Sequence, residues 1–215
     1  STRNGEVRAD SGELAIRRLG QPGDLGWVVK AHGEVYADEF GWDTSFEALV
    51  AKIVADYANE HDENREAAWI AEVDGERVGC VFLVRADDQL AKLRLLLVHP
   101  RGRGRGLGSR LVSTCLDFAR QAGYRRITLW TNDVLTSARR IYEAHGFELV
   151  GQEEHHSFGH DLVGQDWARD LWAPLPRGPR GRLPQRERPR SGELASFLAV
   201  SRPTAGRRRR ARRSP

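Results

Sequence analysis

The 215-residue chain contains no methionine and only two cysteines. Because it begins at Ser1 without methionine, we expect a processed product or a fragment with something missing upstream. Cys80 and Cys115 exclude a disulfide framework, and both lie in apolar segments, so buried free thiols are expected. There is no run of ~18 apolar residues and no signal peptide, so we expect no membrane span and a cytoplasmic protein.

Charge is distributed very unevenly along the chain. Residues 173–215 hold 13 arginines against two acids, a net charge of +11, so the other 172 residues carry −7 although the whole chain carries +4. Seven of the nine prolines also lie in this segment. Such a composition cannot bury enough apolar surface to offset chain entropy. We therefore expect a flexible lead-in at 1–12, one domain at 13–172 and a disordered, basic Arg/Pro-rich tail at 173–215.

Hydrophobic periodicity within 13–172 predicts a mixed α/β sheet. A short strand around 14–19 is followed by a helix over 25–38, capped by Asp24. A second helix, capped by Asp43 or Thr44, runs to about His61. The Asp74-Gly75 pair predicts a hairpin between strands at 69–73 and 77–84. The remaining expected elements are a strand at 92–99, a helix at 108–122 ended by Gly123, a strand at 126–131, a helix at 136–145 ended by Gly146, and closing strands at 147–150 and 167–171.

A glycine-rich loop between a buried strand and a helix is the most informative feature. Glycines alternate at 102, 104, 106 and 108, directly after the apolar strand that ends near Val98. Glycine allows close backbone approach to a ligand, and the first turn of a helix offers unpaired N–H groups and a positive dipole end. With Arg101, Arg103 and Arg105 adding positive charge, the pattern predicts a cradle for phosphate or pyrophosphate.

Two other phosphate-binding patterns do not fit this loop. A P-loop requires Gly-Lys-Ser/Thr, and no lysine follows here. The dinucleotide fingerprint G-x-G-x-x-G fails because its last glycine would fall on Leu107 or Ser109. A disordered Arg-Gly segment that binds RNA would not be flanked by a buried strand and an amphipathic helix. A glycine-rich surface turn without a ligand remains the alternative.

At this point the residues resemble the GCN5-related N-acetyltransferase (GNAT) superfamily. Its Gln/Arg-x-x-Gly-x-Gly/Ala signature is met by Arg103, Gly106 and Gly108, and its Tyr-containing helix followed by Gly-Phe is matched by Tyr142, Gly146 and Phe147. The resemblance covers about 13–172 and extends to the acetyltransferase half of bacterial proteins that fuse a winged helix-turn-helix regulator to this domain. It implies a mostly antiparallel sheet flanked by helices, and acetyl transfer from acetyl-CoA to an amine by direct attack in a ternary complex.

The resemblance also implies roles for individual residues. The backbone at Leu96, Leu97 and Val98 would pair with the pantetheine arm, and the Val98 N–H would polarise the thioester carbonyl. Tyr142 would lie near the sulfur and protonate the departing thiolate. Asn132 is assigned a cofactor contact because Leu135 occupies the position where many family members carry asparagine. The pyrophosphate would be held by N–H groups of the loop and first helical turn, at Arg103, Gly104, Arg105, Gly106, Leu107, Gly108 and Ser109.

Three groups of residues are candidates for the general base that deprotonates the acceptor amine. The first contains Glu34, Glu39 and Asp43, of which Glu39 is our choice, the second is Glu72, and the third is the run 153–161 between the closing strands. Within that run His156, His160 and Asp161 suggest a metal site, but Phe158-Gly159 breaks the helical spacing, so no metal is expected.

The acceptor is expected to be an amine-bearing small molecule or a protein amine, and the acidic body favours a cationic one. The competing interpretation is a regulatory module that senses coenzyme A, or a nucleic-acid-associated module whose basic tail binds phosphates non-specifically. The sequence leaves monomer and dimer open.

Overall fold

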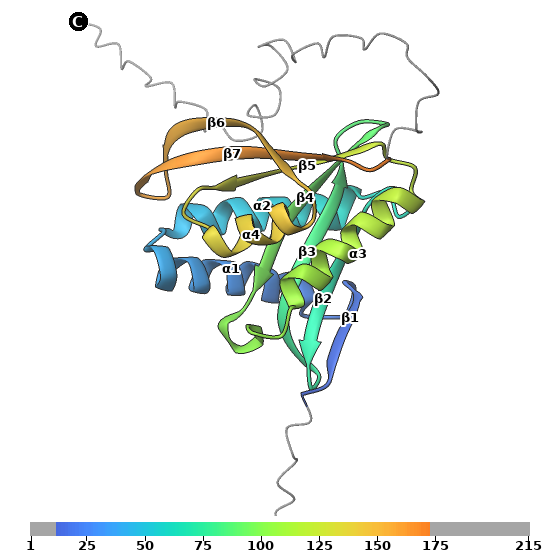
Figure 1. Ribbon diagram of the computed structural model, residues 1–215. Coiled ribbons are helices and arrows are strands. Elements are labelled where there is room, and N and C mark those ends of the chain that lie inside the picture. Colours follow the sequence, from blue (N-terminus) through green and yellow to red (C-terminus); the bar gives the residue numbers. More distant parts are fainter. Residues whose placement is uncertain (1–11, 173–215) are drawn as a thin grey trace, which may run out of the picture. The chain divides into compact units, whose positions relative to one another are not determined.

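The computed structural model of the protein describes residues 12–172, which form a sheet covered by helices on both faces (Figure 1). The expected order of elements is confirmed. In chain order the elements are β1 (Leu14–Arg18), α1 (Asp24–Phe40), α2 (Thr44–Glu60), β2 (Ala67–Val73), β3 (Glu76–Arg85), β4 (Leu90–Val98), the short 3₁₀ helix η1 (Pro100–Gly102), α3 (Leu107–Gln121), β5 (Arg126–Asn132), α4 (Thr136–Ala144), β6 (Glu148–Ser157) and β7 (His160–Asp170).

The seven strands form one sheet in the order β1-β2-β3-β4-β5-β7-β6. Within the described residues β4 and β5 are the only parallel pair, and every other neighbouring pair is antiparallel. The parallel pair is the one joined by a helical crossover, through α3, as the geometry of parallel strands requires. The expectation of a mixed, mostly antiparallel sheet flanked by helices is thus confirmed.

Two hydrophobic cores lie on opposite faces of the sheet. Apolar side chains of α3, including Leu111 and Cys115, pack with Trp69 and Ile127 on one face, where α4 also lies. On the other face α1 and α2 bury Val35 and Val54 against Phe82. Both cysteines are buried and free, as expected. None of the helices within 12–172 is long and apolar enough to cross a membrane.

A bulge interrupts β4 shortly before its end. The pairing register with β3 shifts between Cys80, opposite Leu97, and Phe82, opposite Arg94, so β4 carries an extra residue there. At the bulge Leu95 has a φ of 52°, in the left-handed region of backbone conformation that is unfavourable for residues with a Cβ. On the other side, pairing of β4 with β5 ends at Leu93–Leu129. Beyond that pair the two strands separate.

The expectation that Asp24 caps α1 is wrong. Gly23 occupies the cap position, and Asp24 is the first helical residue, completely buried. Its carboxylate accepts the N–H groups of Gly20 and Gln21 and forms ion pairs with Arg17 and Arg77, each at 2.8 Å. These contacts tie the β1–α1 connection to β3. At α2 the expected cap is confirmed, because the Asp43 carboxylate accepts the Ser45 N–H at 3.0 Å.

The two closing strands are much longer than expected. The run 153–161 is not a connection between them but the paired ends of β6 and β7, with Phe158 and Gly159 at positive φ in the turn. This part of the hairpin is polar and largely exposed, so it lacks the alternation of apolar residues by which strands are detected in a sequence. Of the predicted flanking segments, residues 1–11 of the lead-in and the tail at 173–215 lie outside the described residues.

His32 in α1 is 1% exposed and gives the fold a pH-dependent stability. Its Nδ1–H donates to the Val28 carbonyl at 2.7 Å, and Nε2 has no hydrogen-bond partner within residues 12–172. Burial lowers the pKa of His32 from 6.5 to about 4. Since the unfolded chain binds a proton here at higher pH than the folded chain does, stability is lost as pH falls from about 6.5 towards 4.

We predict that acidification from pH 7.5 to 5 removes about 2 kcal/mol of unfolding free energy through His32 alone. Denaturant unfolding of the native chain and of a His32→Leu variant at both pH values measures this contribution, because leucine fills the site without titrating. An identical loss of stability in both proteins would contradict the assignment.

Candidate functional site

A groove of about 520 Å³ opens where β4 and β5 separate. It runs between α1 and the amino-terminal ends of α3 and α4, and includes the connection from β5 to α4. Nine of the predicted cofactor-binding residues line it: Leu96, Leu97, Val98, Arg103, Gly104, Gly106, Leu107, Gly108 and Ser109. The structure therefore gathers the strand end, the glycine loop and the first turn of α3 around one cavity.

The four alternate glycines of the loop fall into two pairs with different physical causes. Gly104 and Gly106 have φ of +78° and +69°, and a Cβ on either would meet no atom within 4 Å. Their backbone faces open space, as a cradle for a ligand requires. At Gly102 and Gly108, by contrast, a Cβ would lie 2.8 Å from Val78 and 2.6 Å from Ile141. These two glycines permit close packing of the loop on β3 and of α3 on α4.

The amino end of α3 provides a positive electrostatic potential at the glycine loop. Gly106 caps the helix in the left-handed conformation without any side-chain hydrogen bond to the first turn. The N–H groups of that turn are then available to an anion, supported by the helix dipole. The side chain of Ser109, in the same turn, is hydrogen-bonded to Nε2 of His145 at 2.7 Å.

The arginines of the loop contribute less free charge than the sequence suggested. Arg101 is ion-paired with Glu76 at 3.0 Å, and Arg103 is ion-paired with Glu39 at 2.5 Å. Arg103 Nε also donates to the Val98 carbonyl at 3.3 Å, which fixes the loop against the end of β4. Arg105 was expected at the cofactor but is not among the residues that line the groove.

Tyr142 lies behind the groove rather than on its surface. The groove is lined from α4 by Ala138 and Ile141, whereas Tyr142 is 5% exposed and packs near Phe147, with 5.8 Å between ring centroids. Burial raises the pKa of Tyr142, and electrostatic interaction with Tyr36, a groove residue, raises it further. The phenol is therefore protonated at neutral pH, as a proton donor must be. Its catalytic role remains a prediction.

Asn132 is also placed differently from the expectation. It ends β5, is 2% exposed, and its Oδ1 lies 2.8 Å from Nε2 of His155 on β6. The Asn132 side chain is thus directed to the hairpin of β6 and β7. The groove is lined instead by Leu135, which occupies the position where many family members carry asparagine. Asn132 positions His155, whose Nδ1 contacts the Ser157 hydroxyl at 2.9 Å.

Of the candidate bases, Glu39 lies on the groove. Glu34 is paired with Lys30 on the exposed side of α1, Asp43 caps α2, and Glu72 is paired with Arg17 on the sheet. In the hairpin, His156 pairs with Asp161 at 2.7 Å, while His160 contacts the Gly41 carbonyl at 2.9 Å. No group of His, Cys, Asp or Glu within residues 12–172 has the arrangement of a metal site.

Several groove residues were not found from the sequence. Tyr36 and Phe40 of α1 form one wall, and Val134, Leu135, Thr136 and Ser137 form another. The predicted helix ended at 38, so Phe40 lay outside it, and no motif marked Tyr36 as a groove residue. The polar-apolar mixture after β5 carried no motif, although a segment between a parallel strand and its helix is a common place for ligand contacts.

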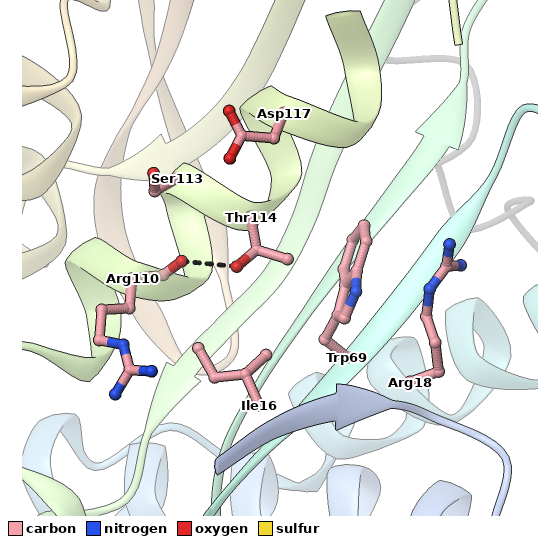
Figure 2. A pocket seen from close by; sticks show the side chains of 7 residues that line it. All are labelled: Ile16, Arg18, Trp69, Arg110, Ser113, Thr114 and Asp117. Carbon is pink, nitrogen blue, oxygen red and sulfur yellow. Dashed lines mark hydrogen bonds between the residues drawn. The ribbon is translucent and has the colours of Figure 1, made fainter. Parts of the chain in front are cut away.

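A second hollow, of about 430 Å³, lies between β1, β2 and α3 (Figure 2). Ile16 and Trp69 form its floor, and Arg110 and Asp117 of α3 border it with opposite charges. The guanidinium of Arg18 lies 5.1 Å from the centre of the Trp69 ring. None of the predicted site residues lies here, so the groove at β4 and β5 is the candidate site.

In this fold the groove between the separated strands β4 and β5 leads to the glycine loop and the amino end of α3, where backbone N–H groups are available to an anion. The chain belongs to the Acetyltransferase (GNAT) family, whose sequence profile matches residues 27–147. Human N-acetyltransferase 8B is 38% identical over 93 residues, covering 41% of each chain. N-acetylaspartate synthetase from Xenopus tropicalis is 36% identical over 89 residues, covering 41% of this chain and 33% of the relative. The chain thus spans less than half the length of these relatives.

Solved structures support the same fold. The structure of yncA from Salmonella typhimurium, with its cofactor acetyl-CoA, has a TM-score of 0.61 to this chain at 17% identity. The match covers 78% of this chain and 99% of the Salmonella chain.

The close approach of Gly108 to Ile141 makes Gly108 a packing residue, and this role can be measured in the absence of ligand. We expect Gly108→Ala to destabilise the protein by about 1–3 kcal/mol, because the added methyl meets Ile141 Cδ1 at 2.6 Å. Ile141→Val removes that atom and should restore most of the loss when combined with Gly108→Ala. A double-mutant cycle of unfolding free energies measures the coupling. Additive effects would contradict the proposed contact.

Proposed function

We propose that this chain is an N-acetyltransferase that moves the acetyl group of acetyl-CoA to an amine by direct attack within a ternary complex. The observation that carries the proposal is the continuous groove from the separated ends of β4 and β5 to the open glycines and amino end of α3. Such a groove matches an elongated ligand with an apolar, amide-bearing arm at one end and a pyrophosphate at the other.

The groove residues fit acetyl-CoA in their chemistry as well as their order. Gly104, Gly106 and the first turn of α3 would hold the pyrophosphate through backbone N–H groups. Past the bulge, Leu96 and Val98 lie on β4 where no β5 partner is paired with them, so their backbone is available to an extended arm. When bound, the cofactor supplies a thioester whose carbonyl carbon accepts the amine.

Two proton transfers complete the reaction. The attacking nitrogen must lose a proton, and Glu39 would receive it, directly or through water; its support is that its carboxylate lines the groove. As the C–S bond breaks, the thiolate takes a proton, for which we retain Tyr142 as donor. Glu39 is paired with Arg103 in this structure. If Arg103 turns to the pyrophosphate on cofactor binding, Glu39 is released to act as base.

Two observations bear on the chemical class of the amine acceptor. One relative is named for the synthesis of N-acetylaspartate, an acetylated amino acid, which supports a small amine acceptor. The acidic charge of the body, by itself, favoured a cationic amine instead.

Calorimetric titration with acetyl-CoA, followed by thiol release on an amine library, tests the cofactor assignment. We expect saturable binding to a single site and turnover with some amines. Absence of acetyl-CoA binding would overturn the proposed function.

We further predict that Tyr142→Phe and Glu39→Gln each lower kcat by about a hundredfold or more, while binding of acetyl-CoA is retained. Glu34→Gln is the matched control, because Glu34 lies on the same helix but is paired with Lys30 away from the groove. Single-turnover rates of acetyl transfer measure the effect. Unchanged rates in Tyr142→Phe or Glu39→Gln would remove that residue from the mechanism.

A further inference from the structure

Arg94 lies on β4 immediately before the bulge, on the sheet face opposite to α3. It is paired with Phe82, which is buried in the core beneath α1 and α2. Lys92, two residues earlier, has the same orientation because it is paired with Val84 of that core. Both side chains are half-buried. Two cations therefore stand side by side on one strand, next to the residues that line the groove.

The guanidinium of Arg94 has no direct acidic partner in the part of the chain that the structure describes. It has no hydrogen bond and no ion pair within residues 12–172. The acid that acts on it electrostatically is Asp56 of α2, whose carboxylate is ion-paired with Lys52. Burial lowers the pKa of Arg94. Burial and the charge of Arg94 lower the pKa of Lys92 to about 8, against the opposing effect of the Asp166 carboxylate on β7, with which Lys92 interacts electrostatically. A half-buried guanidinium whose donors are not used by the described residues is available to an anion from outside, and a charged hydrogen bond made there is stronger than a neutral one.

Arg94 lies opposite β5 at the point where the two strands stop pairing, close to the groove residue Leu96. Arg94 and Trp130 are the first residues past the last β4–β5 pair, Leu93–Leu129, so they stand on the two sides of the opening between the strands. Trp130 is 36% exposed, and its indole lies near the imidazole of His155, with centroids 5.3 Å apart. At about 3.3 Å per residue, Arg94 is roughly 7 Å along the strand from Leu96.

The groove begins two residues further along β4, at Leu96, and Arg94 and Trp130 border it without being among its lining residues. Its lining comes from α3 and α4 on one face of the sheet and from Tyr36, Glu39 and Phe40 of α1 on the other. With the pyrophosphate at α3, an acceptor reaches the thioester from the face of α1 and α2, which is the face of Lys92 and Arg94.

We propose that Arg94 binds a carboxylate of the acceptor, so that the substrates of this enzyme are amino acids rather than simple or cationic amines. This inference rests on the proposed acetyltransferase function. A planar guanidinium presents paired N–H donors that match the two oxygens of a carboxylate. The contact would hold the amine of the same molecule a few bonds away, near the thioester.

The test compares matched acceptors: L-phenylalanine, L-leucine and L-glutamate, each with its α-carboxamide. We expect kcat/KM to be at least about tenfold higher for the carboxylates with the native chain. Arg94→Gln should raise KM for the amino acids about ten- to one-hundredfold and abolish the preference over the amides. Arg94→Lys should retain part of it. KM for acetyl-CoA should be unchanged in both variants, which also shows that they are folded.

Arg126→Gln is the control for loss of a cation on the neighbouring strand, since Arg126 is exposed and paired with Asp170. Equal rates on amino acids and amides, or an equal fall on both in Arg94→Gln, would overturn the inference while leaving acetyl transfer intact. Turnover of amines lacking a carboxylate, with none on amino acids, would overturn it as well. If neither acetyl-CoA binding nor thiol release is found with any amine, the proposed function itself fails.

Discussion

The bulge at Leu95 is the constraint on which the site depends. By inserting a residue into β4 opposite β3, it reverses which side chains face each core and allows β4 to leave β5 after Leu93. The left-handed backbone of Leu95 is unfavourable by about 1–2 kcal/mol, and it persists because pairing with β3 on both sides of the bulge holds it. Without this distortion β4 and β5 would continue to pair, and the sheet would have no opening for a ligand.

The opening joins two environments of different chemistry. Towards α3 it presents backbone N–H groups, glycines without side chains and arginines already engaged with Glu39 and Glu76. Towards α1 it presents the aromatic rings of Tyr36 and Phe40, and Trp130 and Arg94 lie next to it on β5 and β4. This division suits the proposed two-substrate reaction, because each substrate would be recognised separately while their reacting atoms meet between the strands.

Much of this organisation was predictable from the sequence, and the exceptions have physical reasons. Capping signals at Asp43, Gly123 and Gly146, together with helical periodicity, gave the order of elements. The bulge could not be predicted because Leu95, Leu96 and Leu97 are all apolar, so the reversal of the two strand faces does not change the hydrophobic pattern.

The loop glycines were read together as a ligand cradle, since the side chains that require Gly102 and Gly108, Val78 and Ile141, are remote in sequence. The hairpin at 148–170 was underestimated because its exposed end is polar.

Amide hydrogen exchange measured with and without acetyl-CoA reports on the β4 backbone next to the bulge. We expect slowed exchange at Leu96 and Val98 on β4 and in the first turn of α3, residues 107–109. Protection confined to other regions, such as the hollow between β1, β2 and α3, or no change at β4 at saturating ligand, would contradict binding of the cofactor in the groove.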